Sequence, residues 1–134
     1  MVEQKLEDIK KGQPDLYHVA FQKGTEPAFS GKLNYYHGDG MFHCAVCGQA
    51  LFSGKTKFDS GTGWPSFTEP VSPEAIKTAP DNSFGLSRVE VMCGKCEAHL
   101  GHVFNDGPKK NEDGTAATGK RYCLNSVCLL VEEE

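Results

Sequence analysis

The chain has 134 residues, of which 38% are hydrophobic and 24% are charged, and its formal net charge at pH 7 is −4. This length suits one domain, because a chain of this size buries about two thirds of its unfolded surface on folding. The absence of a basic stripe argues against nucleic-acid binding, and no apolar run approaches the ~20 residues of a membrane-spanning helix. The N-terminal residues lack the apolar core of a secretory signal. We therefore expect a soluble cytoplasmic protein, monomeric by default, with residues 1–134 forming a single domain.

The pattern along the chain predicts a mostly β fold with a short helical N-terminus. Residues 3–11 and a second segment capped by Asp15 are expected to be short helices, which make residues 1–23 a helical arm. A core over residues 24–131 follows. Its strands are expected over residues 33–37, 41–44, 50–52, 86–93, 98–104 and 121–131. A short helix is expected over residues 72–79, and loops over the glycine-punctuated stretches 61–66 and 109–120.

Four of the six cysteines form two Cys-x-x-Cys pairs, Cys44 with Cys47 and Cys93 with Cys96. One tight turn directs both sulfur atoms of a pair at a single ion, and two such turns complete the tetrahedral four-thiolate set of structural zinc. Two disulfides or a redox pair are the alternatives, but a redox function needs only one such motif. We therefore predict one structural zinc ion as the cofactor. A chain that did no more than this would be a zinc-knuckle interaction module.

The last predicted strand carries a polar series that includes a thiol. Strict alternation places Arg121, Cys123 and Asn125 on one face of the strand. The Arg121 cation would lower the pKa of the Cys123 thiol and favour the nucleophilic thiolate. Asn125 would hold a polar substrate atom. A solvent-facing strand with an incidental cysteine explains the same stretch equally well.

The sixth cysteine, Cys128, falls on the opposite face of the predicted strand. Alternation groups it with Leu124 and Leu130, so a small buried hydrophobe is expected. Along a regular strand, the five residues from Cys123 to Cys128 span roughly 16 Å. A disulfide requires Cα atoms about 4.4–6.8 Å apart. The two thiols are therefore not expected to pair.

Two histidines, an aromatic ring and a carboxylate follow the second cysteine pair, as His99, His102, Phe104 and Asp106. Histidines beside an activated thiol are the usual proton donors or acceptors near neutral pH. Metal ligation by them is the alternative, although four cysteines already fill a tetrahedral site. The single tryptophan, Trp64, lies on a loop, where an aromatic wall for a ligand is at least as good an interpretation as a core position.

Taken together, these stretches resemble the B-type methionine sulfoxide reductases, which are specific for the R epimer of the sulfoxide. The resemblance covers roughly residues 24–131 and rests on residues 25–31, 44–47, 59–67, 93–96, 99–104, 106–108 and 121–126. It implies a catalytic core of coiled antiparallel sheets, with the zinc site away from the active site. It also implies oxidised proteins or peptides as substrates and thioredoxin or a similar thiol as the reductant.

The resemblance also implies a role for each matched residue. Cys123 is similar to the nucleophile that attacks the sulfoxide sulfur and is left as a sulfenic acid. Trp64 resembles the residue that packs on the substrate methyl group. His102 or His99 would protonate the departing oxygen. The remaining matched residues would position the sulfoxide or complete the active site; they are Arg121, Asn125, Phe104 and Asp106.

The chain departs from many relatives at Thr62, where they carry a resolving cysteine. No cysteine lies among the first 43 residues either. We therefore expect an external reductant such as thioredoxin to attack the sulfenic acid directly, rather than Cys128 or a zinc-site cysteine moving into reach. A Cys–His hydrolase is a further alternative, but it leaves unexplained why Trp64 and an amide replace an acyl groove and an oxyanion hole.

Overall fold

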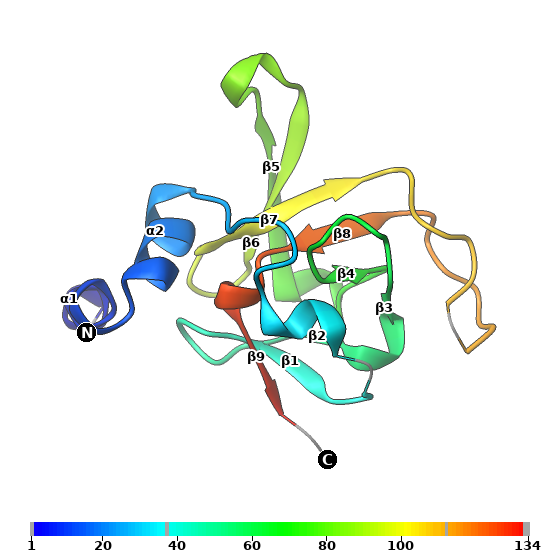
Figure 1. Cartoon of the computed structure of the whole chain (residues 1–134), viewed down its shortest axis with the longest axis horizontal. Helices are drawn as coiled ribbons and strands as arrows, with labels where there is room; N and C mark the ends of the chain where they lie inside the picture. Colours follow the sequence, from blue (N-terminus) through cyan, green and yellow to red (C-terminus); the bar gives the residue numbers. More distant parts are fainter. Residues whose placement is uncertain (1, 37, 112, 133–134) are drawn as a thin grey trace.

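The computed structural model describes residues 2–36, 38–111 and 113–132, and it consists of two sheets with helices at the N-terminus (Figure 1). The helices are α1 (Val2–Gly12) and α2 (Pro14–Gln22). The strands are β1 (Met41–Cys44), β2 (Ala50–Ser53), β3 (Lys57–Phe58), β4 (Ser66–Phe67), β5 (Ile76–Asp81), β6 (Arg88–Cys93), β7 (His99–Phe104), β8 (Arg121–Leu124) and β9 (Leu129–Glu132). Within the described residues, no helix is long and apolar enough to cross a membrane.

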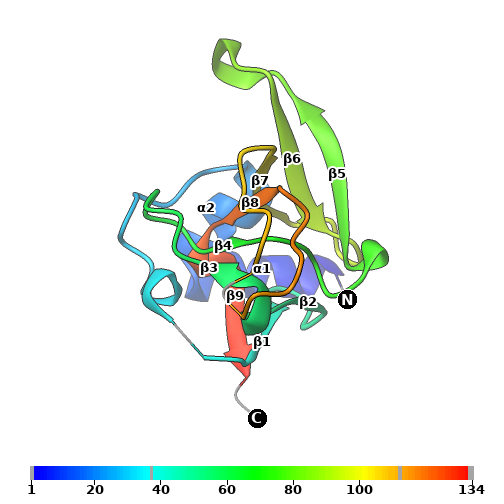
Figure 2. The same ribbon diagram turned by 90° about the vertical axis from the view of Figure 1, so that its right-hand side faces the viewer.

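Both sheets are antiparallel, which confirms the predicted fold class. The smaller sheet has the strand order β2-β1-β9, and the larger has the order β3-β4-β8-β7-β6-β5. Neighbouring strands pair in antiparallel register throughout. Figures 1 and 2 show that the β5–β6 hairpin extends beyond the rest of the molecule. The base of this hairpin adjoins β7 and so reaches the centre of the larger sheet.

The core brings side chains of both sheets together around a group of aromatic rings. Phe67 of β4 stacks on Phe52 of β2 with ring centroids 4.7 Å apart. The ring of Phe42, from β1, meets Phe67 edge-on at 4.9 Å. Tyr122 of β8 contacts Phe52 at 5.7 Å. Such offset and edge-to-face pairs add to the free energy of burying the rings, so this cluster fixes one sheet against the other.

The helical arm is part of the same hydrophobic core. Ile9 of α1 and Leu16, Val19 and Ala20 of α2 are all buried in it. The spacing of the last three follows the helical period, so one face of α2 packs against the rest of the protein. Asp15 does not cap this helix as predicted, because Gln13 occupies the cap position ahead of Pro14 and Asp15 lies in the first turn.

Two local predictions were wrong because contacts with distant segments decide these structures. The N–H of Leu33 donates to Ser126 Oγ at 3.0 Å, and β5 pairs with β6. Residues 32–35 form a short 3-10 helix where a strand was expected over residues 33–37, of which residue 37 lies outside the described residues. Residues 73–75 form a 3-10 turn, and the remainder of the predicted helix over 72–79 is the first part of β5. β5 is an edge strand paired along its length with β6, which tolerates Pro80.

The predicted strand over residues 121–131 is broken in two. β8 ends at Leu124, a 3-10 turn covers Ser126–Cys128, and β9 continues in the other sheet. The separation expected between Cys123 and Cys128 assumed a regular strand and therefore does not apply. Leu130 is 59% exposed and does not share a face with Cys128. The predicted burial of Cys128 is confirmed, because only 1% of it is exposed.

Candidate active site

The pairing of β7 with β8 brings the predicted reactive residues to one face of the larger sheet. His102 lies opposite Cys123, and Phe104 lies opposite Arg121. Residues two apart on a strand share a face, so all four side chains point to the same side. They line one cavity of about 250 Å³. A larger groove between α2 and β9 has no cysteine in its lining.

The cavity has further walls from two loops and from β6. Its lining also includes Thr62, Trp64, Asn125 and Arg88. Arg121, Cys123 and Asn125 therefore meet at one site as alternation predicted, although Asn125 follows the end of β8. Asp106 and His99 are not among the lining residues.

Gly101 allows β7 and β8 to approach at the cavity. A β-carbon at this position would collide with the carbonyl oxygen of Cys123. Only a residue without a side chain fits there, because the atom in the way belongs to the backbone. The pairing of His102 with Cys123 across the β7–β8 ladder thus depends on the glycine that precedes His102.

The thiol of Cys123 is half-buried, and this burial decides its ionisation. Burial raises the pKa of the Cys123 thiol, while the Thr62 hydroxyl and the Arg121 cation lower it in part. Arg121 lowers the pKa of Cys123 as expected, but the free-energy cost of placing a thiolate in a poorly solvated site has the larger effect. The net effect is a pKa of Cys123 above its ordinary value, because burial outweighs the predicted effect of Arg121.

Arg121 is held in place by two neighbours. Its Nε lies 2.9 Å from Asp106 Oδ1 and its second guanidinium nitrogen lies 3.2 Å from Asp106 Oδ2. Its guanidinium also lies over the Phe104 ring, 4.3 Å from the ring centroid. The paired hydrogen bonds from Arg121 lower the pKa of the Asp106 carboxyl. Asp106 therefore orients the cation from outside the cavity.

Trp64 and Asn125 are both fixed by the backbone of Glu26. Trp64 Nε1 donates to the Glu26 carbonyl oxygen at 3.0 Å, and the Glu26 N–H donates to Asn125 Oδ1 at 3.0 Å. Asn125 Nδ2 donates to the Leu100 carbonyl oxygen at 2.9 Å. Both ends of the Asn125 amide thus bond to backbone groups, which accounts for its burial. A contact of Asn125 with substrate stays a prediction.

A group of hydroxyls lies beside the Cys123 thiol. Thr62 Oγ1 is 3.9 Å from Cys123 Sγ and 2.7 Å from Ser60 Oγ. Ser66, which faces Cys123 across the β4–β8 pair, donates to Ser60 Oγ at 2.9 Å. Thr62 therefore lies next to the Cys123 sulfur. A cysteine at position 62 would place a thiol where it could react with Cys123.

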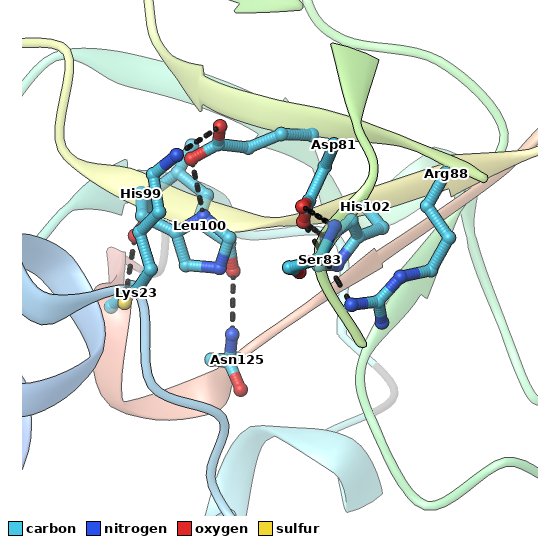
Figure 3. Close-up of polar contacts among 10 residues, drawn as sticks. Lys23, Asp81, Ser83, Arg88, His99, Leu100, His102 and Asn125 are labelled. Carbon is cyan, nitrogen blue, oxygen red and sulfur yellow. Dashed lines mark hydrogen bonds and ion pairs between the residues drawn. The ribbon is translucent and has the colours of Figure 1, made fainter. Parts of the chain in front are cut away.

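Each of the two histidines bonds to its own carboxylate (Figure 3). His102 Nε2 lies 2.7 Å from Asp81 Oδ2, and His99 Nδ1 lies 2.7 Å from Glu90 Oε2. An ionised carboxylate only accepts hydrogen bonds, so these ring nitrogens carry protons. Burial lowers the pKa of His99 in spite of the Glu90 carboxylate, which raises it. The structure thus separates a buried His99, whose pKa burial lowers, from a His102 that faces the cavity.

Comparison with known proteins identifies the family to which this chain belongs. A family model described as the SelR domain matches residues 13–133. The chain is 51% identical over 134 residues to "Peptide methionine sulfoxide reductase MsrB" of Methanosarcina barkeri, covering 99% of this chain and 89% of the relative. It is 50% identical over 129 residues to the protein of the same name from Methanosarcina mazei, covering 96% and 87%. The chain belongs to the B-type methionine sulfoxide reductases. The family resemblance seen in the motifs is thereby confirmed.

The two Cys-x-x-Cys pairs of this reductase domain lie next to each other in the fold. The sulfur atoms of Cys44, Cys47, Cys93 and Cys96 all lie within 4.8 Å of one another. Cys44 Sγ is 3.7 Å from Cys96 Sγ, and Cys47 Sγ is 3.5 Å from Cys93 Sγ. Tetrahedral zinc with Zn–S bonds of about 2.3 Å would hold sulfur atoms about 3.8 Å apart. The residues present therefore fit a closed four-sulfur metal site.

The two knuckles of the reductase have the same backbone turn. The N–H of Gly48 donates to the Cys44 carbonyl oxygen at 2.8 Å, and the N–H of Glu97 donates to that of Cys93 at 2.9 Å. Both donors have a positive φ, 83° for Gly48 and 63° for Glu97. Cys44 ends β1 of the smaller sheet and Cys93 ends β6 of the larger. A bound metal would thus tie the two sheets together.

Three residues at the reductase site were missed in the sequence, and all belong to the β5–β6 hairpin. Asp81 and Glu90 bond to the histidines, and Arg88 lines the cavity. Asp81 was missed because the preceding segment was read as helical. A signal for Glu90 was present, since a carboxylate at position 90 interrupts the otherwise apolar residues at 89 and 91. Burial on both faces of a central strand makes such a charge costly unless it is paired.

Proposed function

We propose that this protein reduces methionine-R-sulfoxide in oxidised proteins or peptides to methionine, with Cys123 as the nucleophile. The observation that carries this proposal is the cross-strand pair of Cys123 and His102 at the wall of one cavity. A thiol and a proton-bearing imidazole on adjacent strands suit a reaction in which sulfur attacks while oxygen is protonated. Membership in the reductase family, with relatives named for this activity, supports the same substrate.

The reaction transfers one oxygen atom from the substrate to the enzyme. The Cys123 thiolate attacks the sulfoxide sulfur, and a proton goes to the sulfoxide oxygen. The sulfur–oxygen bond of the substrate breaks and the oxygen is transferred to the Cys123 sulfur. The new bond between the two sulfur atoms breaks in the same process, so methionine leaves and Cys123 becomes a sulfenic acid. The substrate sulfur is reduced by two electrons, and the Cys123 sulfur is oxidised by two. Two equivalents of thiol then return Cys123 to the thiol and yield a disulfide and water.

His102 is the proton donor in this proposal. It lines the cavity beside Cys123, whereas His99 is buried behind it with Glu90. Burial lowers the pKa of His99, which disfavours the cationic form that a strong donor requires. His99 would therefore support the site through its buried hydrogen bond.

The other predicted residues form the walls of the substrate site. The Trp64 indole would pack on the substrate methyl group, since Glu26 fixes its orientation. Phe104 and Arg121 would bound the cavity on the side of Asp106. Asn125 would hold the loop that carries Glu26 and contact the polar part of the sulfoxide. With methyl and oxygen held at separate places, only one epimer presents its sulfur correctly to Cys123.

An external thiol such as thioredoxin would regenerate Cys123. Thr62 lies beside the Cys123 sulfur, where a resolving cysteine would be in reach, but its hydroxyl cannot form a disulfide. Cys128 is buried, and its Sγ donates to the His99 carbonyl oxygen at 3.4 Å. Burial also raises the pKa of the Cys128 thiol, so little thiolate is available there. The remaining four cysteines belong to the metal site.

The metal in the four-cysteine site would be a single structural zinc ion. Four thiolates at tetrahedral spacing match the preference of zinc and leave no position open for substrate. Its binding would stabilise the fold, because the ligands come from both sheets. We further propose a single domain over residues 1–134, with a helical arm over 1–23 and a catalytic core over 24–131. It would act as a cytoplasmic monomer that repairs proteins after oxidative stress.

One assay tests the proposed activity directly. A peptide containing racemic methionine sulfoxide is incubated with dithiothreitol and either the wild-type protein or Cys123→Ser, and both epimers are followed by chiral chromatography. The wild type should consume the R epimer only, and the variant should consume neither. Full metal occupancy without any turnover would instead favour a zinc-knuckle interaction module. Activity retained in Cys123→Ser would refute the nucleophile.

A further inference from the structure

The β5–β6 hairpin supplies a carboxylate to each of the two histidines. Asp81 is the last residue of β5, and Glu90 lies in the middle of β6. The two carboxylates are not equivalent. Glu90 and His99 are both almost completely buried, with side chains 3% and 4% exposed. The side chains of Asp81 and His102 are each 12% exposed, and His102 lines the cavity with Cys123.

Asp81 is held in its orientation from two sides. Its Oδ1 accepts the Ser83 N–H at 3.0 Å, and its Oδ2 lies 2.7 Å from His102 Nε2. Arg88, its partner in the β5–β6 register, has a guanidinium nitrogen 3.8 Å from Oδ2 (Figure 3). The bond to His102 and the bonds to Ser83 lower the pKa of Asp81. The carboxylate therefore stays charged at any pH at which the enzyme works.

This bond also determines what the His102 ring is able to donate. Because Asp81 accepts from Nε2, the proton of the neutral ring is on Nε2, and Nδ1 carries a lone pair. A neutral His102 in this orientation has no second proton for a substrate. The imidazolium has one on Nδ1, and an adjacent carboxylate stabilises that cation.

We propose that Asp81 is a positioning residue of the reductase reaction, which fixes the His102 ring and stabilises the imidazolium that protonates the sulfoxide oxygen. The proton leaves His102 Nδ1 and joins the sulfoxide oxygen as the sulfur–oxygen bond breaks. The neutral ring keeps its Nε2 proton and its bond to Asp81. This inference rests on the proposed function and adds to it a residue that never touches substrate.

The charged and titratable groups around His102 come from every element packed against it. Asp81 is on β5, Glu90 faces His102 in the β6–β7 register, and Cys123 faces it from β8. The His99 ring, on the same strand, has its centroid 5.4 Å away. Arg88 on β6 bonds to Asp81 and to no other carboxylate among the described ion pairs. Among the described residues, Asp81 is the one carboxylate with a hydrogen bond to His102.

The test uses the pH dependence of kcat/KM, measured with a methionine-R-sulfoxide peptide and dithiothreitol. Asp81→Asn should lower kcat/KM by about tenfold or more, and the alkaline limb of its pH profile should lie at lower pH than that of the wild type. Asp81→Glu should keep the wild-type position of that limb, because the charge is retained. The matched control is Asp113→Asn, since Asp113 Oδ1 also accepts an N–H two residues ahead, at 3.0 Å from Thr115. The control should match the wild type in rate and in pH profile.

A double-mutant cycle with His102→Asn decides whether Asp81 acts through the histidine. The double variant should be no slower than His102→Asn alone, because Asp81 then has no ring to support. The proposal would be overturned if the losses in kcat/KM of the two single variants multiplied in the double variant. It would also be overturned if the alkaline limb of the pH profile had the same position in Asp81→Asn as in the wild type. Thermal unfolding of each variant is measured in parallel, and Asp81→Glu covers the case in which Asp81→Asn does not fold. An inactive wild type would refute the proposed function instead, so the two failures are distinguishable.

Discussion

Thr62 Oγ1 lies 3.9 Å from the sulfur of Cys123. The flanking residues Gly61 and Gly63 both have positive φ, 75° and 95°, so a tight turn presents Thr62 to the cavity. The same turn would bring a thiol at position 62 close to Cys123. A disulfide bond is about 2.05 Å long, so closing it requires the loop to move by roughly 2 Å.

We predict that Thr62→Cys converts the enzyme to intramolecular resolution. After one turnover without reductant, the variant should contain a disulfide between positions 62 and 123, seen by mass spectrometry of proteolytic fragments. The wild type should retain a sulfenic acid on Cys123 that dimedone traps. Thr62→Ser is the control and should behave as the wild type. A disulfide between Cys123 and Cys128 as the main wild-type product would contradict direct reduction by an external thiol.

We predict that Arg121 partly offsets the effect of burial on the Cys123 thiol. Removing the cation in Arg121→Ala should raise the pKa of Cys123 further, so alkylation by iodoacetamide should shift to higher pH. Arg121→Lys retains the charge and should lie closer to the wild type. The measurement is the alkylation rate of the Cys123 peptide between about pH 6 and about pH 10. Identical profiles for Arg121→Ala and the wild type would show that the cation does not act on the thiol.

We predict that Cys93→Ser loses the metal and with it the stability of the fold. Cys93 is buried at the end of β6, and its sulfur lies 3.5 Å from that of Cys47 in the other knuckle. Elemental analysis should show no zinc in the variant, and thermal unfolding should be weakly cooperative or absent. Cys128→Ala is the matched control, because it also removes a buried thiol but leaves all four ligands. A Cys93→Ser protein that unfolds like the control would argue against a structural metal.

We predict that the Asp106–Arg121 pair contributes stability that acid removes. The bond lowers the pKa of Asp106 in the folded state below its ordinary 3.8. Its contribution is therefore complete above that ordinary value and is lost as the pH falls through the lowered one. Urea unfolding should show Asp106→Asn less stable than the wild type at about pH 6, with the difference in the free energy of unfolding shrinking below about pH 4.

Asp106→Asn should also slow turnover, because Arg121 loses the partner that aligns it over Phe104. Asp113→Asn serves as the comparison for this effect. The hydrogen bonds from Thr115 lower the pKa of Asp113, so it shares the acid sensitivity of Asp106, but it does not contact Arg121 or line the cavity. Equal activity of the two variants would show that the orientation of Arg121 is unimportant.

Local patterns in the sequence predicted those parts of the site that depend on short spacing. Two residues between cysteines imply a knuckle, and alternation along β8 correctly distinguished the fully buried Leu124 from the half-buried Cys123. Burial of Cys128 was also predicted correctly, but from one continuous strand, which the structure breaks into β8, a 3-10 turn and β9. The chain changes sheets after Leu124, and nothing in a run of alternating residues marks such a crossing.

Features that depend on distant partners were beyond the reach of the sequence. Asp81 and His102 are 21 positions apart and meet only because β5 pairs with β6 and β6 with β7. The effect of Arg121 on the pKa of Cys123 was predicted with the correct sign, but the larger effect of burial was not, because the neighbouring cation is visible in the sequence and the burial is not. Roles for Trp64 and Asn125 were suggested by the loop and the strand face on which they lie and were made specific by the family resemblance, but their anchoring to Glu26 required the fold.

The ladder between β7 and β8 makes the chemistry sensitive to the number of residues in the chain. His102 pairs with Cys123 because the register of the two strands is set at two fixed points. One is the second Cys-x-x-Cys pair, which precedes β7, and the other is the turn after β8, where the chain crosses to the other sheet. Inserting or deleting one residue within either strand would turn one partner toward the aromatic core. Length variation should therefore be tolerated better in the part of the connecting loop that follows Asp106, and it should abolish activity within the strands themselves.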